Sequence, residues 1–201
     1  AMLRLIALSR LDADTRVRLL EAAWQAMEVR DDRVCAVTDV VASDGELSVV
    51  SDYAEGVSLR ALQGLASVRR KPLAVGVALR IMTDLVAAVG ALHRATIELG
   101  EEAVPLYGGL SPDSILVGTS GRASVLDVAV SSVAGAVESF GSSPDRVAYA
   151  APEQLMVPAH ADPRSDVFSM GILAWELFSG RRLFIGQDKV IGQKVLTAKI
   201  P

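Results

Sequence analysis

The segment from Pro72 to Thr96 constrains the fold more than any other part of this sequence, because it is long, apolar and periodic. Its apolar side chains recur every three or four residues, which predicts one buried face of a helix. They are Leu73, Val77, Ile81, Leu85, Val89 and Leu92. Arg80, Asp84 and His93 are spread through the same segment, so we expect a core helix rather than a membrane span. Pro72 suits the first turn of this helix.

Shorter patterned segments precede the long helix. Residues 3–8 alternate as a short strand, and Asp12 or Asp14 is suited to cap a helix that runs to about residue 27. The apolar face predicted for this helix consists of Val17, Leu20, Trp24 and Met27. Two strands are expected next, at residues 34–41 and 46–53, joined by a Ser-Asp-Gly turn.

The sequence after the long helix changes to short segments and turns. Residues 114–118 and 123–128 are typical of a hairpin, and a Ser- and Gly-rich loop follows at 131–145. A strongly apolar helix is predicted over 165–179, closed by Gly180. Strands with one helix therefore come first and helices dominate afterwards. This order predicts an α+β fold with a small first lobe and a mainly helical second lobe.

Composition narrows the classes of function. Hydrophobic residues make up 51% of the 201 residues, which favours one sizeable core over disorder. The net charge is -4 and no basic run stands out, so we expect no nucleic-acid partner. A single cysteine, Cys35, excludes an intrachain disulfide, and two histidines make a zinc site improbable. With no secretory signal at the start, the expected location is the cytoplasm.

Four short motifs follow one another in the second half, at residues 107–117, 125–129, 151–153 and 166–171. The residues that carry these motifs are Tyr107, Asp127, Ala151, Pro152, Glu153 and Asp166. In this order and spacing they resemble the second lobe of protein kinases, and of the bacterial kinases of the eukaryotic type in particular. Residues 107–117 resemble the catalytic loop and the strand after it. Residues 125–129 resemble the strand carrying the metal-binding aspartate, 151–153 the end of the activation segment, and 166–171 the start of the large buried helix.

The first half resembles the family more weakly. Residues 6–9 are similar to the strand that ends in the phosphate-binding lysine, and residues 51–53 are similar to the hinge. The resemblance places a reduced first lobe at 1–56, without the strands of the glycine-rich loop. A partial second lobe follows at 57–201 and ends near the family's G-helix.

The resemblance also implies that the groups needed for phosphoryl transfer are replaced. The phosphate-binding lysine falls at Ser9, the catalytic aspartate at Gly109 and the metal-binding asparagine at Ser114. The glutamate of the C-helix falls near Ala22, with Glu21 next to it. A general base alone is worth about 10²–10⁴-fold, so losing several such groups predicts a degenerate, inactive kinase, a pseudokinase.

Asp127 is the one ionic group retained, and we interpret it as a vestige rather than a metal ligand. One carboxylate without its asparagine partner is a poor magnesium site. We therefore expect no cofactor and no metal. The structural residues are kept by contrast: the resemblance implies that Asp166 accepts hydrogen bonds from the backbone around Tyr107 and Gly108. Glu153 keeps its position, but its usual arginine partner belongs to the missing C-terminal helices.

Retained scaffold and lost chemistry together predict a protein-interaction or regulatory module. The expected partner is another protein or a neighbouring domain, with self-association as a further possibility and no direct membrane insertion. The apolar side chains of the 165–179 helix favour this interpretation, since missing helices would leave them uncovered. The alternative is a nucleotide-binding sensor or an atypical transferase that uses the same cleft, supported by Asp127. An antibiotic-kinase type of phosphotransferase is disfavoured by residues 151–153.

Overall fold

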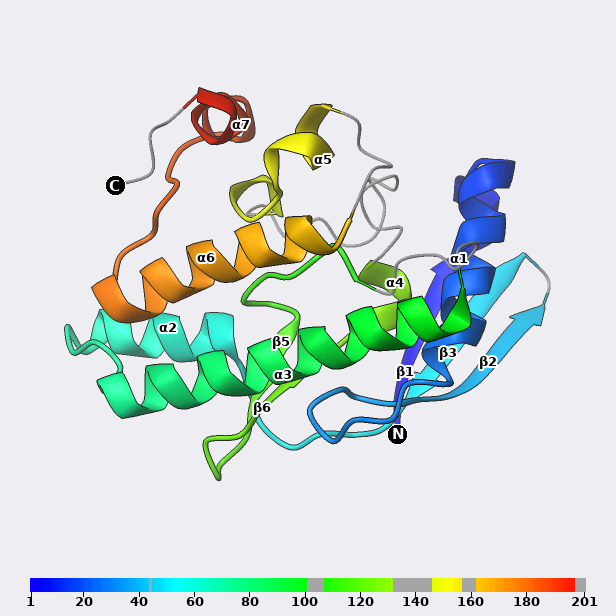
Figure 1. The fold of residues 1–201 in the computed structure, drawn as a ribbon, viewed down its shortest axis with the longest axis horizontal. Coiled ribbons are helices and arrows are strands. Elements are labelled where there is room, and N and C mark those ends of the chain that lie inside the picture. Colours follow the sequence, from blue (N-terminus) through cyan, green and yellow to red (C-terminus); the bar gives the residue numbers. More distant parts are fainter. Residues whose placement is uncertain (44, 101–106, 132–145, 157–161, 198–201) are drawn as a thin grey trace.

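In the computed structural model, the chain folds into a small sheet with one helix, followed by a mainly helical part (Figure 1). The structure describes residues 1–43, 45–100, 107–131, 146–156 and 162–197. The first sheet ends at Ser51 and the second begins at Val57, on either side of the expected lobe boundary. The order of elements is that of the predicted α+β class.

The first sheet is antiparallel, with strand order β1-β3-β2. Its strands are β1 (Met2–Ala7), β2 (Val37–Ser43) and β3 (Glu46–Ser51). Successive side chains of a strand alternate between its two faces. Leu3 and Leu5 are accordingly 59% and 61% exposed on the outer face of β1, whereas Ile6 is buried on the inner face. Arg4 shares that inner face with Ile6 and is thereby directed toward the second lobe.

The first helix, α1 (Ala13–Ala26), begins as predicted but buries a different face. The Asp12 carboxylate accepts a hydrogen bond from the Thr15 amide at 2.9 Å and caps the helix. Val17 and Trp24, predicted to be inside, are 53% and 55% exposed. The buried face consists of Thr15, Leu19, Ala22, Ala23 and Ala26. Small alanine side chains permit a close fit to neighbouring elements, a feature that apolar periodicity does not weigh.

The long helix is α3 (Val75–Leu99), which packs against α6 (Pro163–Ser179) and β6 (Ala123–Val125). It begins at Val75, a few residues after Pro72, where the sequence had predicted its start. Length and composition alone would allow α3 to cross a membrane, but 44% of its most apolar window is buried inside the protein. α6 closes as predicted at Gly180, whose φ of +66° is the left-handed conformation typical of a helix end.

The second sheet has strand order β4-β5-β6 and lies under the helices of the second lobe. Its other strands are β4 (Val57–Ser58) and β5 (Ile115–Val117). The remaining helices are α2 (Leu59–Val68), α4 (Val128–Ser131), α5 (Pro152–Met156) and α7 (Asp188–Thr197). The predicted strand at 123–128 is therefore too long, because the chain leaves the sheet after Val125 and turns into α4.

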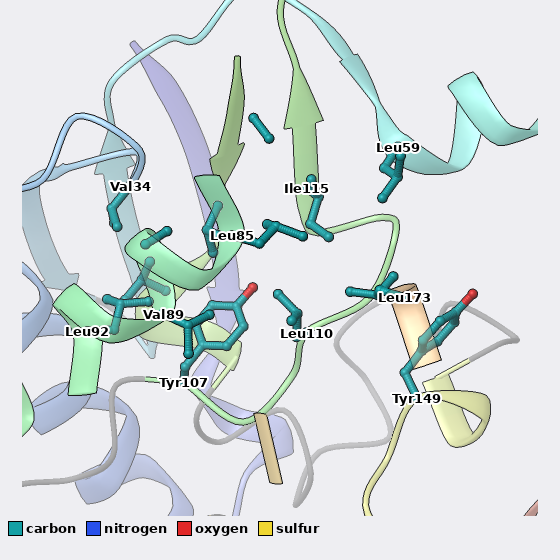
Figure 2. Close-up of a cluster of buried hydrophobic side chains, with 14 of the residues drawn as sticks. Val34, Leu59, Leu85, Val89, Leu92, Tyr107, Leu110, Ile115, Tyr149 and Leu173 are labelled. Atoms are coloured by element: carbon teal, nitrogen blue, oxygen red, sulfur yellow. The ribbon is translucent and has the colours of Figure 1, made fainter. Parts of the chain in front are cut away.

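Backbone hydrogen bonds and side-chain packing join the two lobes. The Cys35 amide donates to the Val125 carbonyl at 2.9 Å, and the Val125 amide donates to the Arg33 carbonyl at 2.8 Å. Figure 2 shows the core that surrounds this junction, in which Val34 from the first lobe lies in the same buried cluster as Leu85 of α3. The segment before β2 is thus fixed to the second lobe.

Asp84 on α3 strengthens the same junction. Its carboxylate is buried and accepts hydrogen bonds from Arg80 Nε at 2.9 Å, the Ala123 amide at 3.1 Å and Arg33 Nε at 3.4 Å. Burial raises the pKa of Asp84, but these donors outweigh it and the net pKa is lowered. The ionised carboxylate therefore stabilises the fold above the pKa of the unfolded chain, and this contribution is lost as the pH falls through the folded pKa.

Replacing Asp84 with asparagine is expected to lower the free energy of unfolding by about 1–2 kcal/mol near neutral pH, since charge-assisted hydrogen bonds are lost. Urea denaturation near neutral pH and at about pH 3 tests this, and the deficit should shrink at the acid pH. Glu98→Gln on the exposed side of the same helix is the matched control. An equal deficit at both pH values would contradict a role for the ionised carboxylate.

Candidate functional site

The inner face of β1 meets the end of β6 in a closed cleft. There the Arg4 guanidinium donates a hydrogen bond to the Asp127 carboxylate, forming an ion pair whose side chains are 42% and 21% exposed. The cleft is completed by Cys35, Val37, Val49, Ser51 and Val128. The remaining space is about 10 Å³, no more than the roughly 10–15 Å³ that one water needs. The ion pair therefore fills the position around the retained aspartate.

The surroundings of Asp127 disfavour a free carboxylate. Burial raises the pKa of Asp127 above its ordinary value, and the charge and the hydrogen bond of Arg4 offset this only in part. Its φ of +57° lies in the left-handed region that non-glycine residues rarely adopt, and the chain turns there from the β6 side into α4. Arg4 thus stabilises the ionised form of a side chain that burial disfavours.

The structure corrects the placement of the lysine position at Ser9. Ser9 is exposed in a 3₁₀ turn, Leu8–Arg10, that follows β1. The cationic side chain that reaches Asp127 from this strand belongs to Arg4. Only the alternation of charged and apolar residues along the strand could have identified it in the sequence.

The C-helix glutamate has no counterpart in the cleft. Ala22 is fully buried in the packed face of α1, and Glu21 lies on its exposed side. The short helix α4 packs against α1 instead (Figure 1). Arg4 of the first lobe thus pairs with Asp127 rather than with an acidic residue of α1.

Gly109, at the expected position of the catalytic aspartate, lies against α4. A Cβ atom at this position would come within 3.1 Å of the Ser131 Cβ and 3.2 Å of the Ser131 carbonyl oxygen. Ser131 is held there because its amide donates to the Asp127 carbonyl at 2.9 Å, closing the turn of α4. The space that an acidic side chain would need is therefore occupied.

Ser114, at the expected asparagine position, organises the loop instead. Its hydroxyl accepts hydrogen bonds from the Tyr107 hydroxyl at 3.1 Å and the Ser111 amide at 3.0 Å, and donates to the Ser111 carbonyl at 3.0 Å. Tyr107 is almost fully buried, and burial raises the pKa of its hydroxyl although the Ser114 hydrogen bond opposes this. Tyr107 and Ser114 therefore act as structural residues of the loop.

Asp166 joins α6 to α3. Its carboxylate contacts His93 Nε2 at 2.8 Å. Burial raises the pKa of Asp166, whereas the hydrogen bond and the charge of His93 act in the opposite direction. The Asp166 Oδ1 atom has no hydrogen-bond partner among the described residues, so the expected bonds from the backbone around Tyr107 and Gly108 stay a prediction. The contribution of His93, which joins α3 to α6, was not predicted.

The 151–153 motif connects α5 to α6 and to the loop. Ala151 is buried and Pro152 begins α5. Glu153 accepts a hydrogen bond from the Ser165 hydroxyl at 2.7 Å, so it has a partner on α6. Gln154 was missed by sequence reasoning, yet its Nε2 donates to the Gly108 carbonyl at 2.6 Å. Gln154 lies next to the 151–153 motif, but nothing in the sequence around it indicated this hydrogen bond.

The donor set around Asp127 does not fit a magnesium–nucleotide complex. Asp127 is paired with Arg4, and the Ser114 hydroxyl is engaged within its own loop. Among the described residues, no group of three or more acidic, histidine or cysteine side chains is placed to hold a metal ion. Mg²⁺ is usually held by carboxylates together with substrate phosphates, and here the Oδ2 atom of Asp127 is already engaged by Arg4.

Comparisons with known proteins agree with this architecture. The protein kinase domain matches residues 14–200. The chain is 30% identical over 156 residues to serine/threonine-protein kinase PknL of Mycobacterium tuberculosis (strain ATCC 25618 / H37Rv), covering 76% of this chain and 36% of PknL. It is 26% identical to probable serine/threonine-protein kinase PknB of Lactococcus lactis, covering 92% of the chain and 28% of the relative. PrkC of Bacillus subtilis is also 26% identical, with coverages of 92% and 27%. The chain spans well under half the length of these curated relatives.

Proposed function

This chain belongs to the protein kinase family, and from that premise we propose that it is a pseudokinase, a kinase-fold module that binds a protein partner or regulates a neighbouring domain without transferring phosphate. The observation that carries the proposal is the ion pair between Arg4 and Asp127. Phosphoryl transfer needs metal ions that neutralise phosphate charge and a base that accepts the substrate proton. Here the guanidinium of Arg4 supplies the positive charge beside Asp127 that a metal ion would supply in an active kinase.

The catalytic loop supports the same proposal. Gly109 offers no base, and Ser131 fills the space beside it. Ser114 offers a hydroxyl that is already engaged by its own loop. Tyr107, which holds the loop in place, and Asp166 are nevertheless retained and buried. A scaffold maintained without its reacting groups is what a binding module requires.

An uncovered apolar face on α6 supports the partner part of the proposal. Val167, Trp175 and Phe178 are 59%, 36% and 47% exposed, and Trp175 and Phe178 line a groove of about 590 Å³. Ile172 and Leu173, from the same predicted set, are buried in the core. Exposed apolar patches often mark contact surfaces. Sedimentation showing a strictly monomeric, soluble chain at high concentration would count against a second copy as the partner.

A cytoplasmic location is part of the same proposal. Its support is the single thiol of Cys35, which is buried and whose pKa is raised to about 11 by burial, so it stays protonated. Such a thiol neither needs nor readily forms a disulfide. Fractionation of the native host that recovered the protein outside the cytoplasm would contradict this.

Nucleotide binding is the decisive test. Thermal unfolding of the chain with millimolar ATP or ADP, with and without Mg²⁺ or Mn²⁺, is expected to show no change in midpoint. Binding at a hundredfold excess over the dissociation constant would stabilise the fold by about 2.7 kcal/mol, which is readily detected. A peptide phosphorylation assay run in parallel is expected to give no product above the no-enzyme rate.

The second candidate is a nucleotide sensor or an atypical transferase, and the retained carboxylate of Asp127 is the observation that favours it. In that case ATP should raise the midpoint in a metal-dependent way, and Asp127→Asn should abolish the rise. Arg4→Ala, which frees the carboxylate, should then enhance the response. Such a pattern would replace the pseudokinase proposal.

A further inference from the structure

A second cavity, distant from Asp127, lies between α2 and the C-terminal end of α6. It has a volume of about 720 Å³, within the range of pockets that hold ligands. Figure 1 shows α2 beside α6 in this part of the second lobe. Five cationic side chains line it, and we call it the basic pocket. They are Arg60, Arg70, Lys71, Arg181 and Arg182.

The basic pocket contrasts with the charge of the chain. The whole sequence carries a net charge of -4, yet Glu176 is the single acidic residue among those lining the pocket. Its carboxylate is buried and engaged by the Tyr149 hydroxyl at 2.7 Å, the Leu183 amide at 3.3 Å and Arg182 Nε at 3.4 Å. The lining of the pocket therefore carries more positive than negative charge.

The cations divide into an anchored pair and an open group. Arg60 forms an ion pair with Asp113 at 3.0 Å, and Arg60 and Arg182 both lie over the Tyr149 ring, at 5.8 and 5.7 Å from its centroid. The open group consists of Arg70, Lys71 and Arg181, which are exposed and form no ion pair with any residue in the described ranges. Positive charge is thus available at the rim of the pocket.

The backbone holds part of this open group in place at some cost. Arg70 has a φ of +50° at the end of α2, a conformation that glycine adopts without strain. Gly180 ends α6 close to Pro72. A Cβ atom placed on Gly180 would lie 3.5 Å from the Pro72 Cβ. The two helix ends therefore carry Arg70 and Arg181 to one rim. The positive φ of Arg70 belongs to the end of α2, where the Arg70 amide donates to the Ser67 carbonyl at 3.0 Å and the Lys71 amide to the Ala66 carbonyl at 3.1 Å.

We propose that the basic pocket binds an acidic segment of a protein partner, through carboxylate or phosphoryl groups on its side chains. Guanidinium groups bind both kinds of oxyanion through paired hydrogen bonds. Leu73, which is partly exposed, adds apolar surface beside the cations, which suits a peptide that mixes acidic and aliphatic residues better than a bare ion. This inference rests on the proposed function as a binding module and names the chemistry of its partner.

Fluorescence anisotropy with three labelled peptides of equal length tests the proposal. One is rich in Glu and Leu, one carries phosphoserine in place of the Glu residues, and one carries Lys instead. Binding of the acidic or phosphorylated peptide is expected, weakening as salt rises because the contacts are ionic. Binding of the Glu peptide identifies carboxylates as sufficient, whereas binding of the phosphoserine peptide alone identifies phosphoryl groups. Equal binding of the Lys peptide, or none by any peptide, overturns the proposal.

Variants assign the binding to this pocket. The double substitution Lys71→Glu and Arg181→Glu should raise the dissociation constant of the acidic peptide by about tenfold or more, since two attractive charges become repulsive. Arg70→Gly should weaken binding by about threefold or more while the unfolding midpoint stays level or rises, because glycine relieves the strained φ. Arg69→Gln, which removes the same charge next to the pocket but outside its lining, should change binding by less than about twofold. Unchanged binding in the double variant overturns the assignment.

The test separates this inference from the proposed function. A chain that transfers phosphate or binds ATP but still captures the acidic peptide refutes only the pseudokinase proposal. A chain that shows no kinase activity and binds none of the peptides refutes only the proposed ligand of the basic pocket. Anionic vesicles offered in parallel should bind weakly, and preferential binding to them in a pocket-dependent way would replace the peptide with a membrane surface.

Discussion

Restoring an aspartate at position 109 is expected to destabilise the chain by about 2–4 kcal/mol without producing a kinase. The new Cβ would lie 3.1 Å from the Ser131 Cβ, and its carboxylate would face the Ser131 carbonyl oxygen, whose approach to the Cβ is 3.2 Å. Overpacking of this kind costs about 1–3 kcal/mol, and a desolvated carboxylate without a donor adds a similar amount. Activity should stay at background because Arg4 still occupies Asp127.

Thermal unfolding of Gly109→Asp measures this effect, and the midpoint should fall by about 2–4 °C for each kcal/mol in a domain of this size. Gly76→Asp is the matched control, because a Cβ at that glycine meets nothing within 4 Å and the site is in the first turn of α3. A Gly109→Asp chain as stable as the parent would show that α4 does not block the position. Phosphate transfer by this variant would show that only the base is missing.

Removing the Arg4 side chain is the second change with a large expected effect. Arg4→Ala leaves Asp127 partly buried and without its cation, which should lower the free energy of unfolding by about 1–3 kcal/mol near neutral pH. This range lies between the values for exposed and buried pairs because Arg4 is 42% exposed. Arg164→Ala, which breaks an ion pair whose arginine is 90% exposed, is the control and should cost about 0.5 kcal/mol or less.

The pH dependence of Arg4→Ala has a definite sign. Burial already raises the pKa of Asp127, and Arg4 opposes this, so its removal raises the pKa further. A carboxyl group that holds its proton more tightly in the folded state loses stability as the pH rises from the unfolded pKa to the folded one. The deficit should therefore be small near about pH 4 and grow toward neutral pH.

A double-variant cycle separates the ion pair from general packing. Adding Asp127→Asn to Arg4→Ala removes the titrating group, so the pH dependence of the deficit should disappear and part of the lost stability should return. Urea denaturation of the parent, both single variants and the double variant at several pH values gives the coupling energy. A deficit that stays constant with pH would assign the effect to the apolar part of the Arg4 side chain.

Much of the second lobe could be predicted from the sequence, because its signals are local. The periodicity of α3, the glycine that ends α6 and the 151–153 motif each depend on residues close together in the chain. The α+β class and the family follow from the order of such segments. The assignment of Gly109 and Ser114 to positions of the catalytic loop rests on the same local spacing and stays a prediction.

The first lobe was predicted less well, for a physical reason. Alanines rather than Val17 and Trp24 face inward from α1, since the space available beside a helix is set by elements far away in the sequence. The cation that meets Asp127 is on β1 at Arg4, not at Ser9, because the register of a strand is decided by its partner strands.

The sequence by itself therefore determined that this chain has the protein kinase fold, because motif spacing is a property of the chain. Only the tertiary structure decided what surrounds Asp127 and Gly109 and what gathers at the ends of α2 and α6. Arg4 neutralises Asp127, Ser131 fills the space beside Gly109, and five cations gather between α2 and α6. Each of these depends on contacts between segments distant in sequence, which are fixed only when the core packs.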